Sequence, residues 1–588
     1  MPPRRGKRTP SKPASPGRSL PTRAAALPAW FRPLLVALSC VILAGVFSSE
    51  IANTDFWWQL RSGQYIWQTH RLPDPDPFAY TTATARDIYA GEALTRRFNL
   101  THEWLAQALL YLSYRTMGFA GIVLCRAGLL LAFCALVALI AYRRTGGFYR
   151  ALAAAFLAAA VVHPFVSDRP YLITFVLLAA TVAILEWRTA AALWLLPLTM
   201  LVWANCHGGF ALGWIVMGAY SAEALFLRLR GRPAKGDVRL WIFCAASALI
   251  AGLNPNGFDV VRVLLNYRQS FLTATLLEWA PPSLWPPTAF SVLLAAAAVV
   301  LLWAYRKVRL VDWLLFAAFA AAGLSAGRNT FLMGLVAPVV IATYWPWKIT
   351  AHRYAEVAAA VLVLAGAAAV FVQGRSFQFH AADWEYPSGA ADFLIANHIT
   401  QPMFNTYEYG GYLMWRLWPQ ERVFIDGRAL SESVFADYRR ILYNSSDRDG
   451  PSATELLNRY GVQVVVMNTF EYTSGMAYVL APALADPDSS AWKLVYADPQ
   501  AIVLLRHPPA GMRILDSSQV LQSMEDECTL HIQHEPRFPG CARNLGVMFS
   551  NAGDFASARR WLRVYLEHAP ASDPEAERAF RSLLDSGK

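Results

Sequence analysis

The chain has 588 residues, of which 55% are hydrophobic and 16% are charged. Soluble domains carry roughly 25% charged residues, so this composition leaves too little polar surface to coat a soluble chain of this length. The apolar residues come in blocks of about 15–20, the length that crosses a bilayer core as a helix. These features exclude a cytosolic enzyme, a secreted disulfide scaffold and a DNA-binding protein, and they indicate a polytopic membrane protein with no nucleic-acid partner.

The amino-terminal segment, residues 1–32, is rich in arginine, proline and serine. It holds eight basic residues and no acidic one, so the net charge of +11 falls to 11 − 8 = +3 for the rest of the chain. Such a segment cannot bury a core, and we expect a disordered tail. The positive-inside rule predicts that this tail is cytoplasmic. No clear cleavage site follows the first apolar block, which predicts an uncleaved first helix.

Eleven apolar blocks predict an α-helical polytopic membrane domain over residues 33–373. A cytoplasmic amino terminus and eleven crossings put the carboxyl terminus outside. The loops assigned to the inside all contain basic residues, as the positive-inside rule expects. The blocks are 33–49, 119–142, 151–167, 170–186, 191–206, 209–227, 240–253, 289–304, 310–326, 330–346 and 355–372.

The first outer loop, residues 50–118, is too long to be a turn. Its segment "DFWWQLRSGQYIWQTHRL" predicts a helix lying along the membrane interface, with its aromatic side chains at headgroup depth. A second amphipathic run, "HEWLAQALLYLSYRTMG", follows a turn rich in proline and aspartate.

Residues 374–508 have the composition of a soluble α/β domain. "ADFLIANHI" predicts a helix, "RVFIDGR" a short strand, and "ATELLNRYGVQVVVM" a helix followed by a buried strand. "WKLVYADPQAIVLLR" predicts a hairpin that turns at Asp498 and Pro499. The segment "YEYGGYLMWRLWP", with Asp426 and Arg428, suits either binding of a sugar acceptor or a strand–turn–strand core with a surface ion pair.

Residues 509–588 contain one segment that resembles a tetratricopeptide repeat. Leu545, Gly546, Phe549, Ala558, Leu562 and Pro570 stand at that repeat's spacings. A plain helical hairpin is the alternative, with further helices at 517–527 and 573–585. A single unit cannot bury its own faces, so we expect it to pack on the α/β domain or on a protein partner. Cys528 and Cys541 lie 13 residues apart, and their pairing as a disulfide stays open.

Polar residues gather at those ends of the apolar blocks that face outward. Charges near membrane depth are costly and are often functional, so this one-sided distribution predicts a site that opens to the outside. The alternative is that helix ends are polar in any case. The residues are Asp55, His102, Glu103, His163, Asp168, Arg169, Asn205, His207, Asn254, Asn256, Glu278, Arg328 and Asn329.

Residues 30–470 resemble the GT-C glycosyltransferases, membrane enzymes that use lipid-linked sugars. The resemblance rests on the long first outer loop, the number of helices and the outer domain. It also rests on "DFWWQLRSGQYI", "HEWLAQALLYL", "NTYEYGGYLMWRLWP" and "VFIDGR", which are similar to bacterial membrane proteins of this type. It implies transfer of a hexose or pentose from a polyprenyl-phosphate donor to an envelope glycan, lipid or protein, at the outer face of the bacterial inner membrane.

The resemblance matches Asp55 to the catalytic aspartate of the family, which implies a base that removes the acceptor's hydroxyl proton. Helix capping by "NTD" is the alternative function of Asp55. Arg169 and Arg328 suit the donor phosphate, because a guanidinium grips phosphate bidentately, although either can instead reach toward the lipid headgroups.

Further candidates for binding the phosphate or the acceptor are His102, Glu103 and His207. The alternative for each is a purely structural function. The chain has asparagine and threonine at 53 and 54, where some family members carry adjacent acids, so no ligand set for a metal is predicted. A divalent metal stays open, and no other cofactor is implied. The rival hypotheses are a flippase for lipid-linked sugars and a non-catalytic scaffold for glycan assembly.

Overall fold

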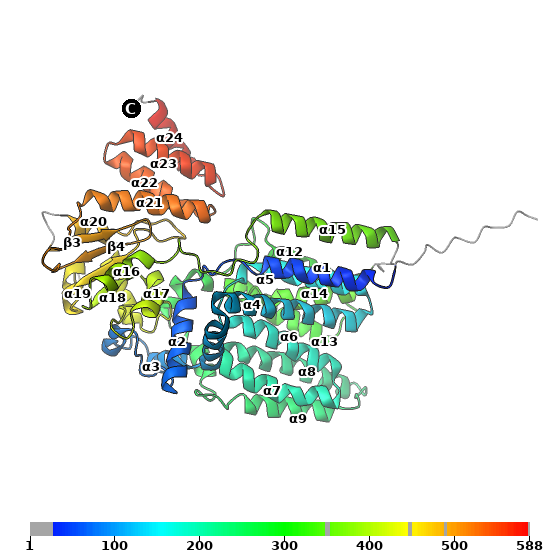
Figure 1. Ribbon diagram of the computed structural model, residues 1–588. Helices are drawn as coiled ribbons and strands as arrows, with labels where there is room; N and C mark the ends of the chain where they lie inside the picture. Colours follow the sequence, from blue (N-terminus) through cyan, green and yellow to red (C-terminus); the bar gives the residue numbers. More distant parts are fainter. Residues whose placement is uncertain (1–27, 347–352, 445–449, 487–490, 586–588) are drawn as a thin grey trace, which may run out of the picture.

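The computed structural model describes residues 28–346, 353–444, 450–486 and 491–585. Most of the predicted disordered tail and most of the inner loop at 347–353 lie outside the described residues. A bundle of long apolar helices forms one part of the molecule. The outer domain lies at one end of this bundle, and the carboxyl-terminal helices continue from the outer domain (Figure 1).

Each of the eleven apolar blocks lies on a helix. Three described segments are long and apolar enough to cross a membrane, namely Glu92–Thr145, Phe148–Phe165 and Gly208–Leu229. The total of eleven crossings therefore stays a prediction. The helices are α1 (Phe31–Val46), α4 (Trp104–Thr145), α5 (Phe148–Val162), α6 (Tyr171–Trp187), α7 (Ala190–Cys206), α8 (Ala211–Leu229), α9 (Asp237–Ile250), α12 (Ala289–Trp303), α13 (Leu310–Ser325), α14 (Leu332–Tyr344) and α15 (Arg353–Val372).

Helix α4 consists of two helices that meet at Gly118. This glycine has φ +61° and ψ −148°, a conformation that is readily available only to glycine. The amphipathic run predicted before residue 118 and the apolar block predicted from residue 119 are therefore two separate helical segments. The first belongs to the outer face of the molecule and the second to the bundle.

Basic residues at the predicted inner end of the bundle are paired with acids. Arg144 of α4 contacts Glu186 at 2.8 Å and Asp312 at 2.9 Å, and Arg309 contacts Glu186 at 2.8 Å. The acidic partners are buried. These pairs connect the ends of α4, α6 and α13. Removal of one partner would leave a buried charge unpaired, which is strongly destabilising, so the pairs hold these ends together.

Short elements connect the helices at the outer end of the bundle. They carry four of the thirteen polar residues that the sequence singles out there, namely His163, Glu278, Arg328 and Asn329. These elements are η1 (Tyr80–Thr84), α3 (Glu92–Thr101), η2 (His163–Phe165), η3 (Gly208–Phe210), α10 (Val260–Asn266), α11 (Phe271–Thr275), η4 (Leu277–Trp279) and η5 (Gly327–Asn329).

Helix α2 (Asp55–Thr69) forms as predicted, but several of the side chains expected at the membrane interface are buried in protein. Phe56, Trp57, Trp58 and Leu60 are buried. The Trp57 indole packs edge-on against the ring of Tyr412, with the ring centroids 4.9 Å apart. Figure 1 shows α2 between the bundle and the outer domain. The aromatic side chains of its first turn therefore join two parts of the protein, whereas Trp67 in its last turn is 40% exposed.

The outer domain contains a four-stranded sheet in the order β1-β2-β4-β3. Strands β1 and β2 are parallel, whereas β4 is antiparallel to both β2 and β3. The predicted hairpin at Asp498 and Pro499 is confirmed. The strands are β1 (Met403–Asn405), β2 (Val464–Met467), β3 (Lys493–Ala497) and β4 (Ile502–Leu505), and the helices are α16 (Ser388–Ala396), α17 (Tyr407–Leu417), α18 (Glu432–Leu442), α19 (Ala453–Arg459) and α20 (Leu480–Ala485).

One prediction for the outer domain is wrong, and one of the two alternatives left open for another of its segments does not hold. "RVFIDGR" is not a strand of the sheet, because only Val423 forms an isolated bridge, to Ala79 of the first outer loop. "YEYGGYLMWRL" forms helix α17 and not a strand–turn–strand unit. The first segment is extended because it pairs with a distant loop, and no local pattern specifies that partner.

Arg428 forms a buried triad and not the predicted surface ion pair. Its guanidinium contacts Asp426 at 2.6 Å and Asp76 at 2.9 Å, and all three side chains are at most 3% exposed. Asp76 also accepts the backbone N–H of Phe78 at 3.1 Å, as expected of a turn residue. The triad therefore fixes the loop after Val423 to the first outer loop.

The carboxyl-terminal region consists of α21 (Ser518–His534), α22 (Gly540–Asn551), α23 (Phe555–His568) and α24 (Pro574–Asp585). Helices α22 and α23 pack together through buried Leu545, Ala558 and Leu562, three of the positions with repeat spacing. Glu527 of α21 accepts the backbone N–H of Thr469 at 2.8 Å. The region thus packs on the outer domain, while its assignment as a tetratricopeptide repeat stays a prediction.

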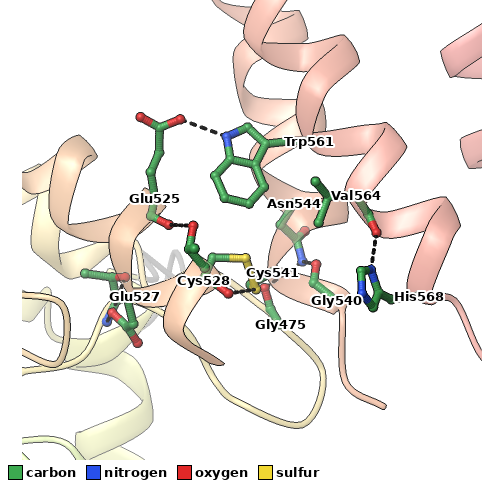
Figure 2. Close-up of a disulfide and its surroundings, with 12 residues drawn as sticks. Gly475, Glu525, Glu527, Cys528, Gly540, Cys541, Asn544, Trp561, Val564 and His568 are labelled. Carbon is green, nitrogen blue, oxygen red and sulfur yellow. Dashed lines mark hydrogen bonds between the residues drawn. A yellow bond between two sulfur atoms is a disulfide. The ribbon is translucent and has the colours of Figure 1, made fainter. Parts of the chain in front are cut away.

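A disulfide between Cys528 and Cys541 joins α21 to α22 (Figure 2). Two hydrogen bonds hold the surrounding elements: Trp561 Nε1 donates to Glu525 Oε1 at 2.8 Å, and Asn544 Nδ2 donates to the carbonyl of Gly475 at 2.7 Å. The disulfide fixes the start of the helical hairpin against α21, and it is typical of proteins in oxidising compartments.

We expect alkylation of the unfolded chain, isolated without reductant, to modify five of the seven cysteines, because two are in the disulfide. After reduction all seven should react, as measured by intact mass. A variant with serine at both 528 and 541 should show five in both conditions. Seven modified cysteines in the unreduced wild type would contradict the disulfide.

Candidate active site

A cavity of about 340 Å³ lies where the outer end of the bundle meets α2, α3 and the loop at 427–432. All six residues predicted for the site line this one cavity, although they come from segments up to 273 positions apart. They are Asp55, His102, Glu103, Arg169, His207 and Arg328. The structure therefore brings the predicted set together, and what each residue does there is a separate question.

Asp55 is the first residue of α2, and its carboxylate faces polar partners. Its Oδ1 accepts the indole N–H of Trp58 at 2.9 Å, and its Oδ2 lies 3.1 Å from the Arg169 guanidinium. Asn53 supplies the local capping contact, because its side chain accepts the backbone N–H of Asp55 at 3.0 Å. Burial raises the pKa of Asp55, and Arg169 opposes this shift. The geometry thus favours a site carboxylate over a helix cap.

Arg169 and Arg328 share the carboxylate of Glu278. Arg169 contacts one oxygen at 3.4 Å, and Arg328 contacts the other at 3.2 Å. The Arg328 guanidinium also stacks on Trp279, 4.4 Å from the ring centroid. These contacts hold both guanidiniums at the cavity wall and do not direct them toward headgroups. Guanidinium groups are the side chains that match carboxylate and phosphate anions in shape and charge, and here both contact one carboxylate.

Glu103 connects the two histidines. Its carboxylate lies 3.5 Å from His102 Nε2 and 3.6 Å from His207 Nε2, and it accepts the Gln59 amide at 2.5 Å. The chain bends between α3 and α4 at this point, so neighbouring residues 102 and 103 can face one cavity.

His207 has a defined tautomer. Its Nδ1 accepts the backbone N–H of Gly209 at 2.9 Å and lies 2.8 Å from the Thr174 hydroxyl oxygen, so the ring proton is on Nε2, toward Glu103. Burial lowers the pKa of His207 to about 3. The imidazole is therefore neutral at pH 7 and presents a hydrogen-bond donor to Glu103.

Gly427 is in close contact with Asp55. A Cβ atom at this position would collide with Asp55 Oδ1 and lie 3.0 Å from Trp58 Nε1. The Gly427 carbonyl accepts the Tyr407 hydroxyl at 2.9 Å, and the adjacent triad of Arg428 holds the loop in place. The loop after residue 426 is thus a rigid wall against the carboxylate.

The carboxylates nearest Asp55 are bound by arginines. Within the described ranges, no three side chains of histidine, cysteine, aspartate or glutamate are arranged to hold a metal ion. The positive charge around Asp55 comes from Arg169 and Arg328. The part of the chain that the structure describes therefore shows no ligand set for the divalent metal that the sequence leaves open.

A second cavity, of about 1570 Å³, adjoins the first. The two cavities share Arg169, Arg328, Glu278, His102 and His207. Away from these residues, the second cavity is lined by many apolar side chains of the bundle, including Val46, Phe165, Leu212, Ile215, Val263 and Leu264. The polar groups thus stand at the junction between a small polar cavity and a large, more apolar one.

Sequence reasoning missed four side-chain or backbone contributions to the site. From the sequence, Glu278 is only one of several outward polar residues, and Gly427 carries no signal of its own. Trp58 and Gln59 were interpreted as parts of an interfacial helix. Their contacts join segments distant in sequence, so one sequence contains no signal that pairs Gly427 with Asp55.

The arrangement of helices, first outer loop and outer domain resembles that of a known membrane enzyme in overall fold. The oligosaccharyltransferase of Archaeoglobus fulgidus in its apo form has a similar structure, with a TM-score of 0.51 and 10% identity over 92% of this chain and 86% of that one. The same enzyme tethered through a disulfide to an acceptor peptide with the NVT sequon gives a TM-score of 0.49 and 11% identity, over 83% and 75%. No protein-family model and no curated protein matches the chain.

Proposed function

We propose that this protein transfers a sugar from a polyprenyl-phosphate donor to an acceptor on the outer side of the membrane. The observation that carries the proposal is the junction of the two cavities, where Arg169 and Arg328 line both and Arg169 contacts Asp55 of the small cavity at 3.1 Å. The GT-C fold supports the same reaction class. Hexose or pentose transfer, a bacterial inner membrane and an envelope acceptor are the finer parts of the proposal, taken from the sequence resemblance.

The site chemistry fits a displacement at the anomeric carbon of the sugar. Asp55 takes the proton of the acceptor hydroxyl while that oxygen forms the new glycosidic bond. The bond between the anomeric carbon and the phosphate oxygen breaks, and its electron pair leaves with the phosphate. Arg169 and Arg328 stabilise the charge on the departing phosphate. The two histidines that line both cavities, His102 and His207, orient the bound groups together with Glu103, which lines the small cavity and contacts both rings.

The large cavity suits the lipid part of the donor. Its apolar side chains favour an isoprenoid chain, whereas the shared arginines favour the phosphate at its end. In this arrangement the phosphate takes the place of Glu278 between the guanidiniums. The disulfide at 528 and 541 supports the placement of the carboxyl-terminal region outside the cytoplasm.

The test compares purified protein in lipid nanodiscs with polyprenyl-phosphate hexoses and pentoses as donors and a total envelope extract as acceptor. We expect sugar to appear on acceptor material and free polyprenyl phosphate to accumulate, both measured by mass spectrometry. In cells, deletion of the gene should remove one sugar from the envelope glycans. Movement of the lipid-linked sugar across the bilayer without transfer would favour the flippase hypothesis. Copurification of a protein partner without any sugar transfer would favour the scaffold hypothesis.

The pH dependence of transfer should report Asp55. The base acts only when deprotonated, so activity should fall as the pH falls through its pKa. Because burial raises that pKa, the acid limb should lie above the ordinary aspartate value of about 4. Measurement of kcat/KM between pH 4 and 9 tests this, with protein stability checked at each pH. An acid limb at or below pH 4 would contradict a buried base.

A further inference from the structure

One end of the small cavity is not used by the proposed chemistry. The loop at 427–432 forms a continuous wall from Gly427, which touches Asp55, to Glu432 at the start of α18. Tyr89, Glu92 and Ser270 also line the cavity. Because Glu432 is only five residues from Gly427, this end lies within reach of a molecule whose reactive group is at Asp55.

Glu432 is a buried carboxylate with unused bonding capacity. The residue is 2% exposed, yet its Oε1 accepts no hydrogen bond from any described residue. Buried carboxylate oxygens without a partner are costly, so such an oxygen in a residue that lines a cavity indicates a ligand that donates a hydrogen bond. The backbone N–H of Glu432 donates to Glu92 Oε1 at 2.8 Å, which fixes the start of α18 beside α3.

Glu92 is already satisfied and serves to position Glu432. Its Oε2 accepts the backbone N–H of Ile88 at 2.6 Å, and Arg96 lies 3.8 Å from Oε1. Arg96 itself donates to the carbonyl of Leu430 at 3.0 Å and to Asp87 at 2.7 Å. The wall is therefore held from both sides, and the Glu432 carboxylate is the group left for a ligand.

The rest of this wall is aromatic and polar. Tyr89, Tyr267 and Tyr407 line the cavity, as do Thr95 and Asn99 of α3. Aromatic faces pack on the C–H faces of sugar rings, while carboxylates and amides bind their hydroxyl groups. None of the lining residues belongs to a strand, so the cavity offers no sheet edge along which an extended peptide would add its backbone.

We propose that this end of the cavity binds a neutral saccharide acceptor, and that a hydroxyl group of the acceptor donates to Glu432. This inference rests on the proposed function, which supplies the reaction at Asp55, and it adds the chemical class of the acceptor. Glu432 positions the acceptor and takes no part in proton transfer. An amine-bearing acceptor is the competing chemistry, because a buried carboxylate also binds an ammonium group.

Saturation-transfer NMR on the protein in nanodiscs tests the inference without any turnover. The probes are neutral methyl glycosides of common hexoses and pentoses, the corresponding amino sugars, and short peptides containing serine, threonine and asparagine. We expect transfer to at least one neutral glycoside, with binding about 10-fold or more weaker in Glu432→Ala. Glu432→Gln, which keeps an acceptor oxygen, should bind within about threefold of the wild type.

Two further variants make the result specific. Asp55→Asn should still bind the glycoside, so loss of transfer activity and loss of acceptor binding are separate results. Glu527→Gln is the matched control, because Glu527 is also buried with an unpartnered Oε1 but lies outside the cavity. It should bind like the wild type.

Three outcomes overturn the inference while leaving transferase activity intact. The first is binding of peptides but not glycosides, and the second is absence of binding by any neutral glycoside at millimolar concentration. The third is binding of amino sugars only, with loss in both Glu432→Gln and Glu432→Ala, which would identify an ammonium site. Glycoside binding that is unchanged in Glu432→Ala would place the saccharide elsewhere and also contradict the proposal.

Discussion

Replacement of Asp55 by asparagine is expected to lower the rate of sugar transfer by about 10²–10⁴-fold, the usual contribution of a general base. Asparagine has nearly the same shape and can still contact Trp58, but it cannot take a proton. It also removes the negative charge that pairs with Arg169 at 3.1 Å. Arg169 then has more capacity for the phosphate, so KM for the donor should stay the same or fall.

The measurement is the initial rate of release of polyprenyl phosphate, together with envelope glycans from a deletion strain that expresses each variant. Asp526→Asn on α21 is the matched control, since Asp526 lies on neither cavity. Equal amounts of each protein in the membrane must be confirmed. Full transfer by Asp55→Asn would exclude Asp55 as the base and would leave Arg169 with a purely electrostatic function.

The helices of the bundle could be predicted because their cause is local. A block of about 15–20 apolar residues satisfies its own backbone hydrogen bonds only as a helix in a membrane, and each predicted block lies on one. The hairpin at Asp498 was predictable for a similar reason, since its turn residues and both of its apolar strand segments lie in one short stretch of sequence. The number of helices that actually cross the bilayer depends on packing and tilt, which no single block determines.

The environment of α2 could not be predicted because its partners are distant in sequence. An amphipathic aromatic helix is suitable for a membrane interface and equally suitable for a protein interface. Long-range contacts, such as that of Trp57 with Tyr412 more than 350 positions away, show that this helix packs on the outer domain. The same holds for "RVFIDGR", whose only bridge is to Ala79.

The six predicted site residues were found because they share a position relative to the membrane. Each follows or precedes an apolar block on the side assigned to the outside, so topology alone collects them at one end of the bundle. The contacts between them depend on the bend before α4 and on the turns before α6 and α14. Partners from the outer domain, such as Gly427, have no membrane block beside them and so gave no comparable signal.

Replacement of Gly427 by alanine is expected to lower transfer by about 10²-fold, the cost of moving a catalytic group by about 1 Å. The new Cβ would collide with Asp55 Oδ1, and the Arg428 triad prevents the loop from moving away. Asp55 must therefore turn, which breaks its hydrogen bond with Trp58 and its contact with Arg169. The thermal unfolding temperature should change little, since the collision involves one side chain at a cavity wall.

Gly218→Ala on α8 is the control for this variant, because Gly218 has no atom within 4 Å of the added Cβ. It should transfer like the wild type. The double variant Asp55→Asn/Gly427→Ala should be no slower than Asp55→Asn alone, because the alanine acts only by displacing the base, and residues that act as a unit are not additive. If the two losses in rate multiplied, Gly427 would contribute to transfer independently of Asp55, for example by contacting the acceptor. Wild-type activity in Gly427→Ala would mean that the wall does not hold Asp55 in its reactive position.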